Sequence, residues 1–334
     1  MAILVATTLL LAVACVLVGS VNIPAAQVGS IVTGQGCDNE AWTIIVLEAR
    51  IPMVVTAALA GAALAVSGLL LQTSFNNPLA GPSILGVSTG AGLGVAIVML
   101  AMGGTVGGFF GSSVGSYVAI LMGALLGAAL VLALLIVFSS IVKSSSVLLI
   151  IGILVSYLAS SIISLLNSLA TEEGMASYVA WGFGTFSSVT PSQMPVFAST
   201  IIVSLMASAL MVKPLNAMLL GTRYATNIGV NVRRSRNLML LVTGLLTAIV
   251  TAFCGPIGFL GLVVPHVARL MLATSNHSRL IPATMLAGAA TALLCSLLSV
   301  MGSHVIPINA ITPVIGVPII IYLIVNRRKI QYFN

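Results

Sequence analysis

The sequence predicts an all-α, polytopic membrane protein with about ten transmembrane helices. Hydrophobic residues make up 59% of the 334 residues and charged residues only 5%, whereas a soluble globular domain usually carries about 25% charged residues. A soluble chain of this length would have to cover its surface with polar groups, and these are missing. The net charge of +7 does not indicate a nucleic-acid partner, because no basic patch interleaved with aromatic residues occurs in the sequence.

Apolar stretches of helical length recur along the whole chain, and each predicts one span. The first is expected to be a membrane helix rather than a secretory signal, because no basic segment precedes it. The span at 258–272 is short and interrupted. The longest connections are 20–49 and 168–192 on one side and 213–237 on the other. The expected spans are 2–19, 50–72, 84–101, 113–138, 146–167, 193–212, 238–254, 258–272, 281–300 and 310–326.

The distribution of charge predicts the orientation, because short loops rich in Lys and Arg stay in the cytoplasm. An even number of spans places both termini on one side. When the C-terminal Arg327, Arg328 and Lys329 are placed inside, every other Lys and Arg except Arg50 also falls inside. All five acids then fall outside: Asp38, Glu40, Glu48, Glu172 and Glu173. We therefore expect cytoplasmic termini and a cytoplasmic segment at 213–237.

Two short segments resemble one another and fall on opposite sides of the membrane in this topology. Residues 80–87 read AGPSILGV, residues 254–262 read CGPIGFLGL, and each follows a long apolar helix. Halves of opposite orientation indicate an inverted repeat, which is common in transporters. The halves would run roughly from 50 to 167 and from 238 to 326. Gly86, Gly90 and Gly94 recur every four residues, which predicts close helix packing.

The sequence contains no recognisable site that would couple transport to a source of energy. Ion-driven carriers usually need acids within their spans, and none of the five acids lies in mid-span. No G-x-x-x-x-G-K-[ST] motif occurs, so this chain is not expected to bind ATP through a P-loop. His266 and His304 fit structural roles better than metal binding, and no nucleophile–base pair is evident. We therefore expect a non-enzymatic protein with no catalytic residue, metal site or cofactor of its own.

Several motifs, spread over nearly the whole chain, carry a family resemblance. They are Arg50-Ile51-Pro52, GAALAVSGLLLQTSFNNPLAGPSILGVSTGAGLG at 61–94, Tyr178-Val179-Ala180-Trp181-Gly182, Ile228-Gly229-Val230 and GPIGFLGLVVPHVARL at 255–270. With them the chain resembles the permease subunits of type II binding-protein-dependent ABC importers, which carry iron-siderophore complexes, haem and cobalamin. The resemblance implies one transmembrane permease domain over 1–334, with 213–237 as its cytoplasmic coupling segment.

The resemblance also implies an assembly in the bacterial inner membrane. The permease would be a homodimer, surrounded by lipid, with the substrate path on its two-fold axis. Two ATPase subunits, which hold ATP and Mg²⁺, would dock on the cytoplasmic side. A periplasmic or lipid-anchored substrate-binding protein would dock outside. An ion-coupled secondary transporter and a channel are the alternative classes, and the residues do not distinguish between the possible chelates.

Three sets of residues match functional segments of that family. The ATPase-coupling segment would comprise Leu220, Gly221, Thr222, Arg223, Tyr224, Ala225, Thr226, Asn227, Ile228 and Gly229. A cytoplasmic gate would comprise Asn77, Pro78 and Leu79, with Ser144, Ser145 and Ser146 nearby; turn and N-cap chemistry explains these residues equally well. Arg50 would lie on the outer surface and pair with an acid of the binding protein, which would steer docking.

Two departures from the family pattern qualify these roles. Thr222-Arg223 stands where the family usually has an acidic pair, which points to a different surface on the ATPase partner. Val305-Ile306-Pro307-Ile308-Asn309 stands where the family often has Glu-Leu-Pro-Ile-Gly, so the resemblance does not assign a particular substrate.

Overall fold

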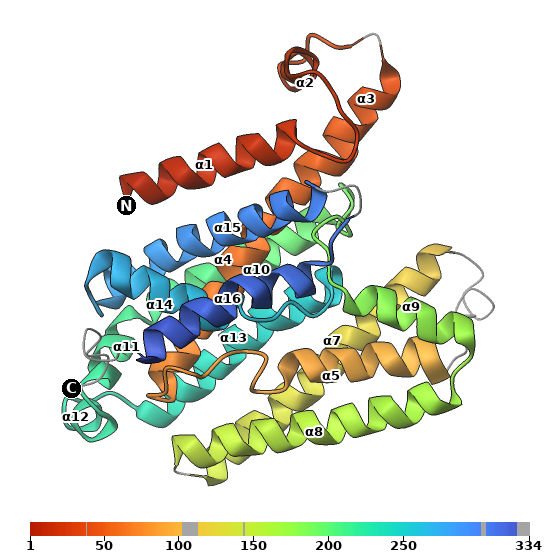
Figure 1. Cartoon of the computed structure of the whole chain (residues 1–334). Coiled ribbons are helices and arrows are strands. Elements are labelled where there is room, and N and C mark those ends of the chain that lie inside the picture. The colour runs from red at the N-terminus through yellow and green to blue at the C-terminus, as the bar shows by residue number, and fades with distance from the viewer. Residues whose placement is uncertain (38, 102–112, 143, 302–304, 326–334) are drawn as a thin grey trace.

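The computed structural model describes residues 1–37, 39–101, 113–142, 144–301 and 305–325, and every regular element in these ranges is a helix (Figure 1). Each predicted span coincides with a helix. These are α1 (Ala2–Leu17), α4 (Ile51–Ser74), α5 (Val87–Ala96), α7 (Ser113–Ile141), α8 (Ser145–Leu169), α10 (Met194–Leu210), α13 (Val232–Cys254), α14 (Leu260–Leu272), α15 (His277–Val300) and α16 (Ile308–Val325). The all-helical prediction is therefore confirmed.

The spans differ in length. Within the described residues, five helices are long and apolar enough to cross a membrane, and α10 with the following α11 (Val212–Leu219) makes a sixth if the 51° bend between them is allowed. Helices α1, α5, α14 and α16 are apolar but shorter. The π-helical turn η2 (Ile97–Ala101) extends α5.

The remaining helices lie in segments that the sequence analysis treated as connections. They are α2 (Ala25–Val32), α3 (Glu40–Ile44), the π-helical turn η1 (Ile45–Arg50), α9 (Glu172–Gly182), α11 and α12 (Thr222–Asn227). These segments are too short or too polar to resemble a span. Together α3, η1 and α4 form one continuous stretch of 35 residues, Glu40–Ser74. The prediction began this span at 50 because Glu48 and Arg50 interrupt its apolar run.

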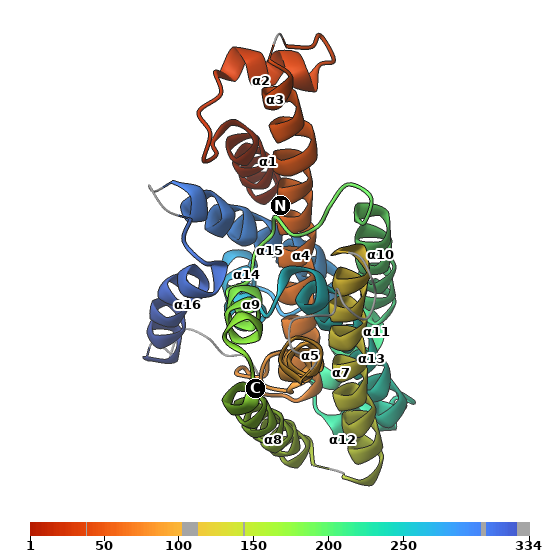
Figure 2. The same cartoon turned by 90° about the vertical axis from the view of Figure 1, so that its right-hand side faces the viewer.

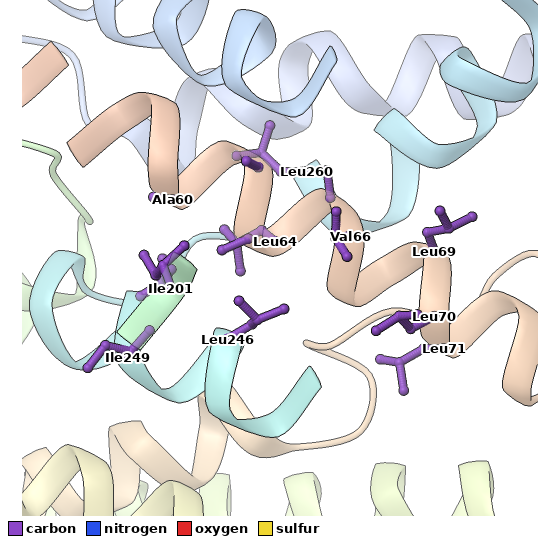
Figure 3. Close-up of a cluster of buried hydrophobic side chains, with 14 of the residues drawn as sticks. Ala60, Leu64, Val66, Leu69, Leu70, Leu71, Ile201, Leu246, Ile249 and Leu260 are labelled. Carbon is purple, nitrogen blue, oxygen red and sulfur yellow. The ribbon is translucent and has the colours of Figure 1, made fainter. Parts of the chain in front are cut away.

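Helix α4 forms the centre of the bundle (Figures 1 and 2). It packs against α15, α13, α14 and α10. Its most apolar 18-residue window is 83% buried, whereas the corresponding windows of α7 and α8 are only 22% buried. Figure 3 shows Leu64 of α4 next to Leu246 of α13, and Ile249 of α13 near Ile201 of α10. Helices α7 and α8 therefore leave most of their surface for lipid or another protein.

Glycine pairs allow the central helices to approach closely. In the α4–α15 crossing Gly61 faces Gly288, and in the α5–α7 crossing Gly94 faces Gly123. At each of these four positions a Cβ atom would overlap or crowd the backbone carbonyl of the opposing glycine. Lipid gives helices no hydrophobic reason to associate, so close van der Waals packing at small residues has to hold them together. The close packing predicted at Gly94 is thus confirmed.

The two Gly-Pro segments form opposed breaks. The first connects α4 to α5, and the second connects α13 to α14. In Figure 1, α5 runs toward the end that holds α9, whereas α14 runs toward the end that holds α11. The breaks touch, because a Cβ on Gly261 would lie 2.8 Å from Cδ of Pro82. The division into halves at 50–167 and 238–326 stays a prediction, which this opposed arrangement supports.

Charge is separated between the two ends of the molecule. One end carries α11, α12 and the start of α13, with Lys213, Arg223, Arg233, Arg234 and Arg236. Helices α2, α3 and α9 lie at the other end, with Glu40, Glu172 and Glu173. Asp38, Lys143, His304 and the terminal Arg327, Arg328 and Lys329 lie outside the described residues.

Candidate coupling and gate site

The predicted coupling residues form a short exposed helix between two glycines. Helix α12 is bounded by Gly221 and Gly229, whose φ angles are +100° and +90°, values that glycine adopts without steric cost. The side chain of Ala225 is fully buried, and its carbonyl accepts a hydrogen bond from the N–H of Val230 at 2.9 Å. One side of α12 is thus anchored to the protein, and the glycines set its direction.

The other side of α12 exposes large apolar residues. Leu220 is 66% exposed, Tyr224 49% and Ile228 55%. Tyr224 and Ile228 are four residues apart across α12 and its C-cap, so they share a face. Leu220 precedes Gly221, at the end of α11, and Arg223 is exposed as well. We call Leu220, Tyr224 and Ile228 the α12 ridge. The ridge lies at the basic end of the molecule, and clustered apolar side chains on such a surface mark a protein contact.

The predicted gate residues Asn77, Pro78 and Leu79 form a compact turn after α4. The side-chain oxygen of Asn77 accepts a hydrogen bond from the N–H of Leu79 at 2.9 Å, and the Asn77 carbonyl accepts one from Ala80 at 3.1 Å. Nε2 of His266 lies 2.7 Å from the Pro78 carbonyl oxygen. Because a carbonyl can only accept, the ring donates this bond. Through this hydrogen bond, His266 of α14 fixes the Asn77–Leu79 turn against the protein.

A second buried contact ties α14 to the end of α4. Nη1 of Arg269 donates to the side-chain oxygen of Gln72 at 2.7 Å, and the Gln72 amide donates to the carbonyl of Leu262 at 3.1 Å. Gln72 is 0% exposed, so its amide and the guanidinium satisfy one another away from water. This contact lies five residues before the Asn77 turn, and it fixes where the turn begins.

His277 links the coupling segment to the same end of α4. The side-chain oxygen of Asn216, in α11, accepts from the backbone N–H and from Nδ1 of His277, both at 2.9 Å. Nε2 of His277 lies 2.9 Å from the hydroxyl of Thr73 in α4. One imidazole therefore joins α11, α15 and α4. We call Gln72, Thr73, Asn216, His266, Arg269 and His277 the polar network.

Of this network the sequence singles out only His266, for which it predicts a structural role, and the hydrogen bond to Pro78 agrees with that role. Gln72, Thr73, Asn216, Arg269 and His277 are single polar residues among apolar ones, and no role is predicted for them. The available signal was their chemistry, since polar residues inside membrane spans are rare and mark functional contacts. Their partners are distant in the chain, so no local pattern could pair them.

Ser144, Ser145 and Ser146 begin α8. The hydroxyl of Ser144 accepts a hydrogen bond from the N–H of Val147 at 3.4 Å, which is the N-cap role that the sequence analysis gave as the alternative. Ser145 is the first residue of the helix, and Ser146 is exposed. A gate role for these serines stays a prediction.

Arg50 is not on the outer surface, and the predicted exposure is wrong. Its side chain is 4% exposed. Nη1 donates to the carbonyls of Val16 at 2.8 Å and Leu17 at 2.9 Å, and Nη2 donates to Val21 at 2.5 Å. The last carbonyls of a helix have no partner within it, and the guanidinium has five donors to supply. Arg50 therefore joins the end of α1 to the start of α4, and its pairing with an acid of the binding protein stays a prediction.

Comparison with known proteins agrees with the motifs. Residues 7–326 match the FecCD transport family. The chain is 33% identical over 289 residues to the vitamin B12 import system permease protein BtuC of Citrobacter koseri, covering 86% of this chain and 84% of that relative. It is 29% identical over 323 residues to the hemin transport system permease protein HmuU of Yersinia pestis, covering 96% and 95%.

A solved structure has the same architecture over nearly all of both chains. It is described as an inward-facing conformation and is assigned to the metal-chelate type of ABC transporter. It aligns with a TM-score of 0.83 at 29% identity, covering 96% of this chain and 97% of the other. With the family match over residues 7–326, these likenesses confirm the resemblance to type II importer permeases: the chain belongs to the FecCD transport family.

Proposed function

We propose that this chain is the membrane-spanning subunit of an ABC importer, and that it passes a metal chelate such as a ferric siderophore, haem or cobalamin into the cell. The chain itself is a transport subunit and not an enzyme. Two partner ATPases hold ATP and Mg²⁺, and a periplasmic or lipid-anchored binding protein delivers the chelate. The relatives named for vitamin B12 and hemin transport support the substrate class. The single observation that carries the ATPase coupling is the exposed α12 ridge.

The proposed homodimer is supported by helix surfaces that a single chain leaves uncovered. Helix α8 is mostly unburied, yet it carries Ser160, Ser164 and Asn167 on one face, and polar groups rarely face lipid. We propose that this face belongs to a path shared by two copies in a homodimer. The start of α1 and the end of α16 lie at the end that holds α12 (Figure 1), which supports cytoplasmic termini in a multi-pass inner-membrane protein.

The polar network suggests how coupling reaches the gate. An ATPase that grips the α12 ridge would move α11, which is joined to α12 by two residues. Asn216 of α11 would carry that movement through His277 to Thr73 at the end of α4. His266 and Arg269 hold the Pro78 turn and Gln72 from the neighbouring α14. A shift of α11 would then reorient the turn at Asn77–Leu79.

The decisive experiment removes one ridge residue and compares it with a matched surface residue. Ile228→Ala is expected to weaken binding of the ATPase subunit by about fivefold or more, because truncating a hot-spot contact costs about 1 kcal/mol or more. Val32→Ala is the control, since Val32 has the same 55% exposure but lies in α2 at the opposite end. Both variants are reconstituted in proteoliposomes, and ATPase retention and ATP-dependent uptake are measured.

Replacing residues 222–228 by a Gly/Ser linker should abolish ATP-stimulated uptake while the protein still inserts in the membrane. Equal ATPase retention in the Ile228 and Val32 variants would contradict the docking role of the ridge. Uptake that is driven by an ion gradient without any ATPase would instead support the alternative, an ion-coupled secondary transporter.

A further inference from the structure

A cavity of about 510 Å³ lies between α5, α8 and the end of α9. It shares no residue with the α12 ridge or the polar network. Its lining combines hydroxyl groups, amides and two aromatic rings, and none of the lining residues is charged. Pockets of this volume, with a few polar groups among apolar ones, are typical of small-molecule sites.

The wall formed by α8 is polar. Ser160, Ser164 and Asn167 line the cavity, and their spacing of four and three residues places them on one face of the helix. Gly92 of α5 lies opposite. A Cβ atom there would come within 3.5 Å of the Tyr178 hydroxyl, so a larger side chain at this position would enter the cavity.

Two polar atoms of the lining residues are buried without a hydrogen-bond partner. They are Nε1 of Trp181, which can only donate, and Oδ1 of Asn167, which can only accept. Leaving such a group unsatisfied costs about 1–3 kcal/mol. Unsatisfied groups are rare in native proteins and call for an explanation such as an absent ligand. Both residues line the same cavity, and both atoms are buried beside it.

The aromatic wall is held in a fixed position. The rings of Tyr178 and Trp181 stack with centroids 6.0 Å apart and an interplanar angle of 28°. Burial raises the pKa of Tyr178, so the phenol stays neutral at physiological pH. The cavity therefore presents an uncharged aromatic surface next to the Trp181 N–H.

Asn309 fixes the rim of the cavity. Its side-chain amide donates to the carbonyls of Gly182, at 2.8 Å, and of Pro256, and its oxygen accepts from the N–H of Gly258 at 3.4 Å. This amide joins the end of α9 to the break before α14. A rim fixed before binding reduces the entropic cost of holding a ligand.

We propose that this cavity binds a neutral, amide- or hydroxyl-bearing edge of the transported chelate and discriminates against anionic chelates. A small rotation of the two side chains would let an amide accept from Trp181 and donate to Asn167. An anionic group would lose its hydration without gaining a cationic partner from the lining, which is unfavourable. The inference rests on the proposed transport function and names the substrate class within it.

The test measures binding to the full chain in lipid nanodiscs, without ATPase or binding protein. The probes are a neutral gallium(III) tris-hydroxamate chelate and an anionic gallium(III) tris-catecholate chelate. Bound gallium is counted by elemental mass spectrometry after equilibrium dialysis. We expect the neutral chelate to bind at least about tenfold more tightly than the anionic one. The anionic chelate loses its hydration and finds no cationic partner in the lining, a cost of the size of one lost charged hydrogen bond. Equal binding of the two probes, or no binding of the neutral probe, would overturn the proposal.

Trp181→Phe keeps an aromatic ring but removes the N–H, and it should weaken binding of the neutral probe by about tenfold. Trp42→Phe is the matched control, because the chain has two tryptophans and Trp42 lies in α3. Gly92→Val, which fills the cavity from the opposite wall, should also reduce binding. Unchanged binding in both cavity variants, at unchanged melting temperature, would reject the site.

The two proposals fail separately in these experiments. The binding assay contains no ATPase, so loss of gallium selectivity would leave the coupling proposal intact. An Ile228→Ala variant that binds gallium normally but loses ATP-dependent uptake would support coupling through the ridge without bearing on the cavity.

Discussion

Arg50 shows how the same residue can fit two different interpretations. Its position before Ile51-Pro52 and the family resemblance predicted an exposed charge. In the structure its donors satisfy the carbonyls at the end of α1. The sequence identifies the residue and even its membrane side, but the carbonyls that it satisfies lie 29 to 34 positions away. A polar residue's partner is set by packing, which a linear pattern does not contain.

Removing the Arg50 side chain should destabilise the outer end of the protein. Arg50→Ala would remove the donors from three carbonyls in part-buried contacts, and the expected loss is about 1–3 kcal/mol of unfolding free energy. Arg50→Lys should recover only part, because a single ammonium cannot reproduce the guanidinium fork. The measurement is the thermal midpoint of the purified protein in detergent.

Arg279→Ala is the control for Arg50, since Arg279 is exposed and a surface substitution usually changes stability by less than about 0.5 kcal/mol. If Arg50→Ala melts like Arg279→Ala while binding-protein affinity falls, the originally expected docking role would be correct.

At the scale of helices, close crossings determine which elements touch. The four-residue spacing of Gly86, Gly90 and Gly94 predicted a smooth face on α5, and Gly90 and Gly94 do meet Gly127 and Gly123 of α7. The spacing could not identify α7 as the partner. Helix positions were predictable because apolar length is a local property. The helices α2, α3 and α9 were not, because they are short and are stabilised by what they pack against.

The α4–α15 crossing should be sensitive to one added methyl group. In Gly61→Ala the new Cβ would overlap the carbonyl of Gly288, and overpacking of this kind costs about 1–3 kcal/mol. Gly29→Ala is the matched control, because a Cβ in α2 meets nothing within 4 Å and alanine favours a helix by about 0.5–1 kcal/mol. In thermal unfolding, Gly61→Ala should lower the midpoint and Gly29→Ala should raise it. Equal midpoints would contradict the close crossing.

The hydrogen-bonded link between α11 and α4 can be broken without changing the α12 ridge or the Asn77 turn. Asn216→Ala removes the acceptor that orients the His277 ring, so the assembled complex should still bind its ATPase but hydrolyse ATP with reduced uptake. Asn22→Ala, at an exposed position in the outer segment, is the control. The ratio of chelate transported to ATP hydrolysed is the readout. An unchanged ratio in the Asn216 variant would rule out this route of coupling.

At the scale of the whole molecule, charge and length together made the topology predictable. The membrane excludes charge, so a correct set of spans has to separate Lys and Arg from Asp and Glu. The described residues show that separation between the α12 end and the α9 end. The cavity near Trp181 was not predictable, because its walls come from four helices (α5, α8, α9 and α16) and both Gly-Pro breaks, which are distant in the chain.

Cysteine labelling can test the orientation against a simple background. Cys15, Cys254 and Cys295 are buried, so Cys37→Ala removes the one partly accessible native thiol. In that background, Arg233→Cys should react with a membrane-impermeant maleimide only after the inner face is opened. Glu172→Cys should react from outside in intact cells. Labelling of Arg233→Cys from the exterior would invert the topology and would remove the ridge from the ATPase side.

The continuous stretch Glu40–Ser74 has a mechanical consequence. Its 35 residues span about 52 Å at 1.5 Å per residue, whereas the hydrocarbon layer is about 30 Å thick. The helical stretch is therefore longer than the hydrocarbon layer. Helix α3 forms one end of it, and the Asn77 turn follows directly after the other end. Arg50 braces its irregular π-helical section against α1. Under the proposed function, a binding protein that docks on the α3 end would tilt the whole stretch and shift the Asn77 turn at the other end before ATP is hydrolysed.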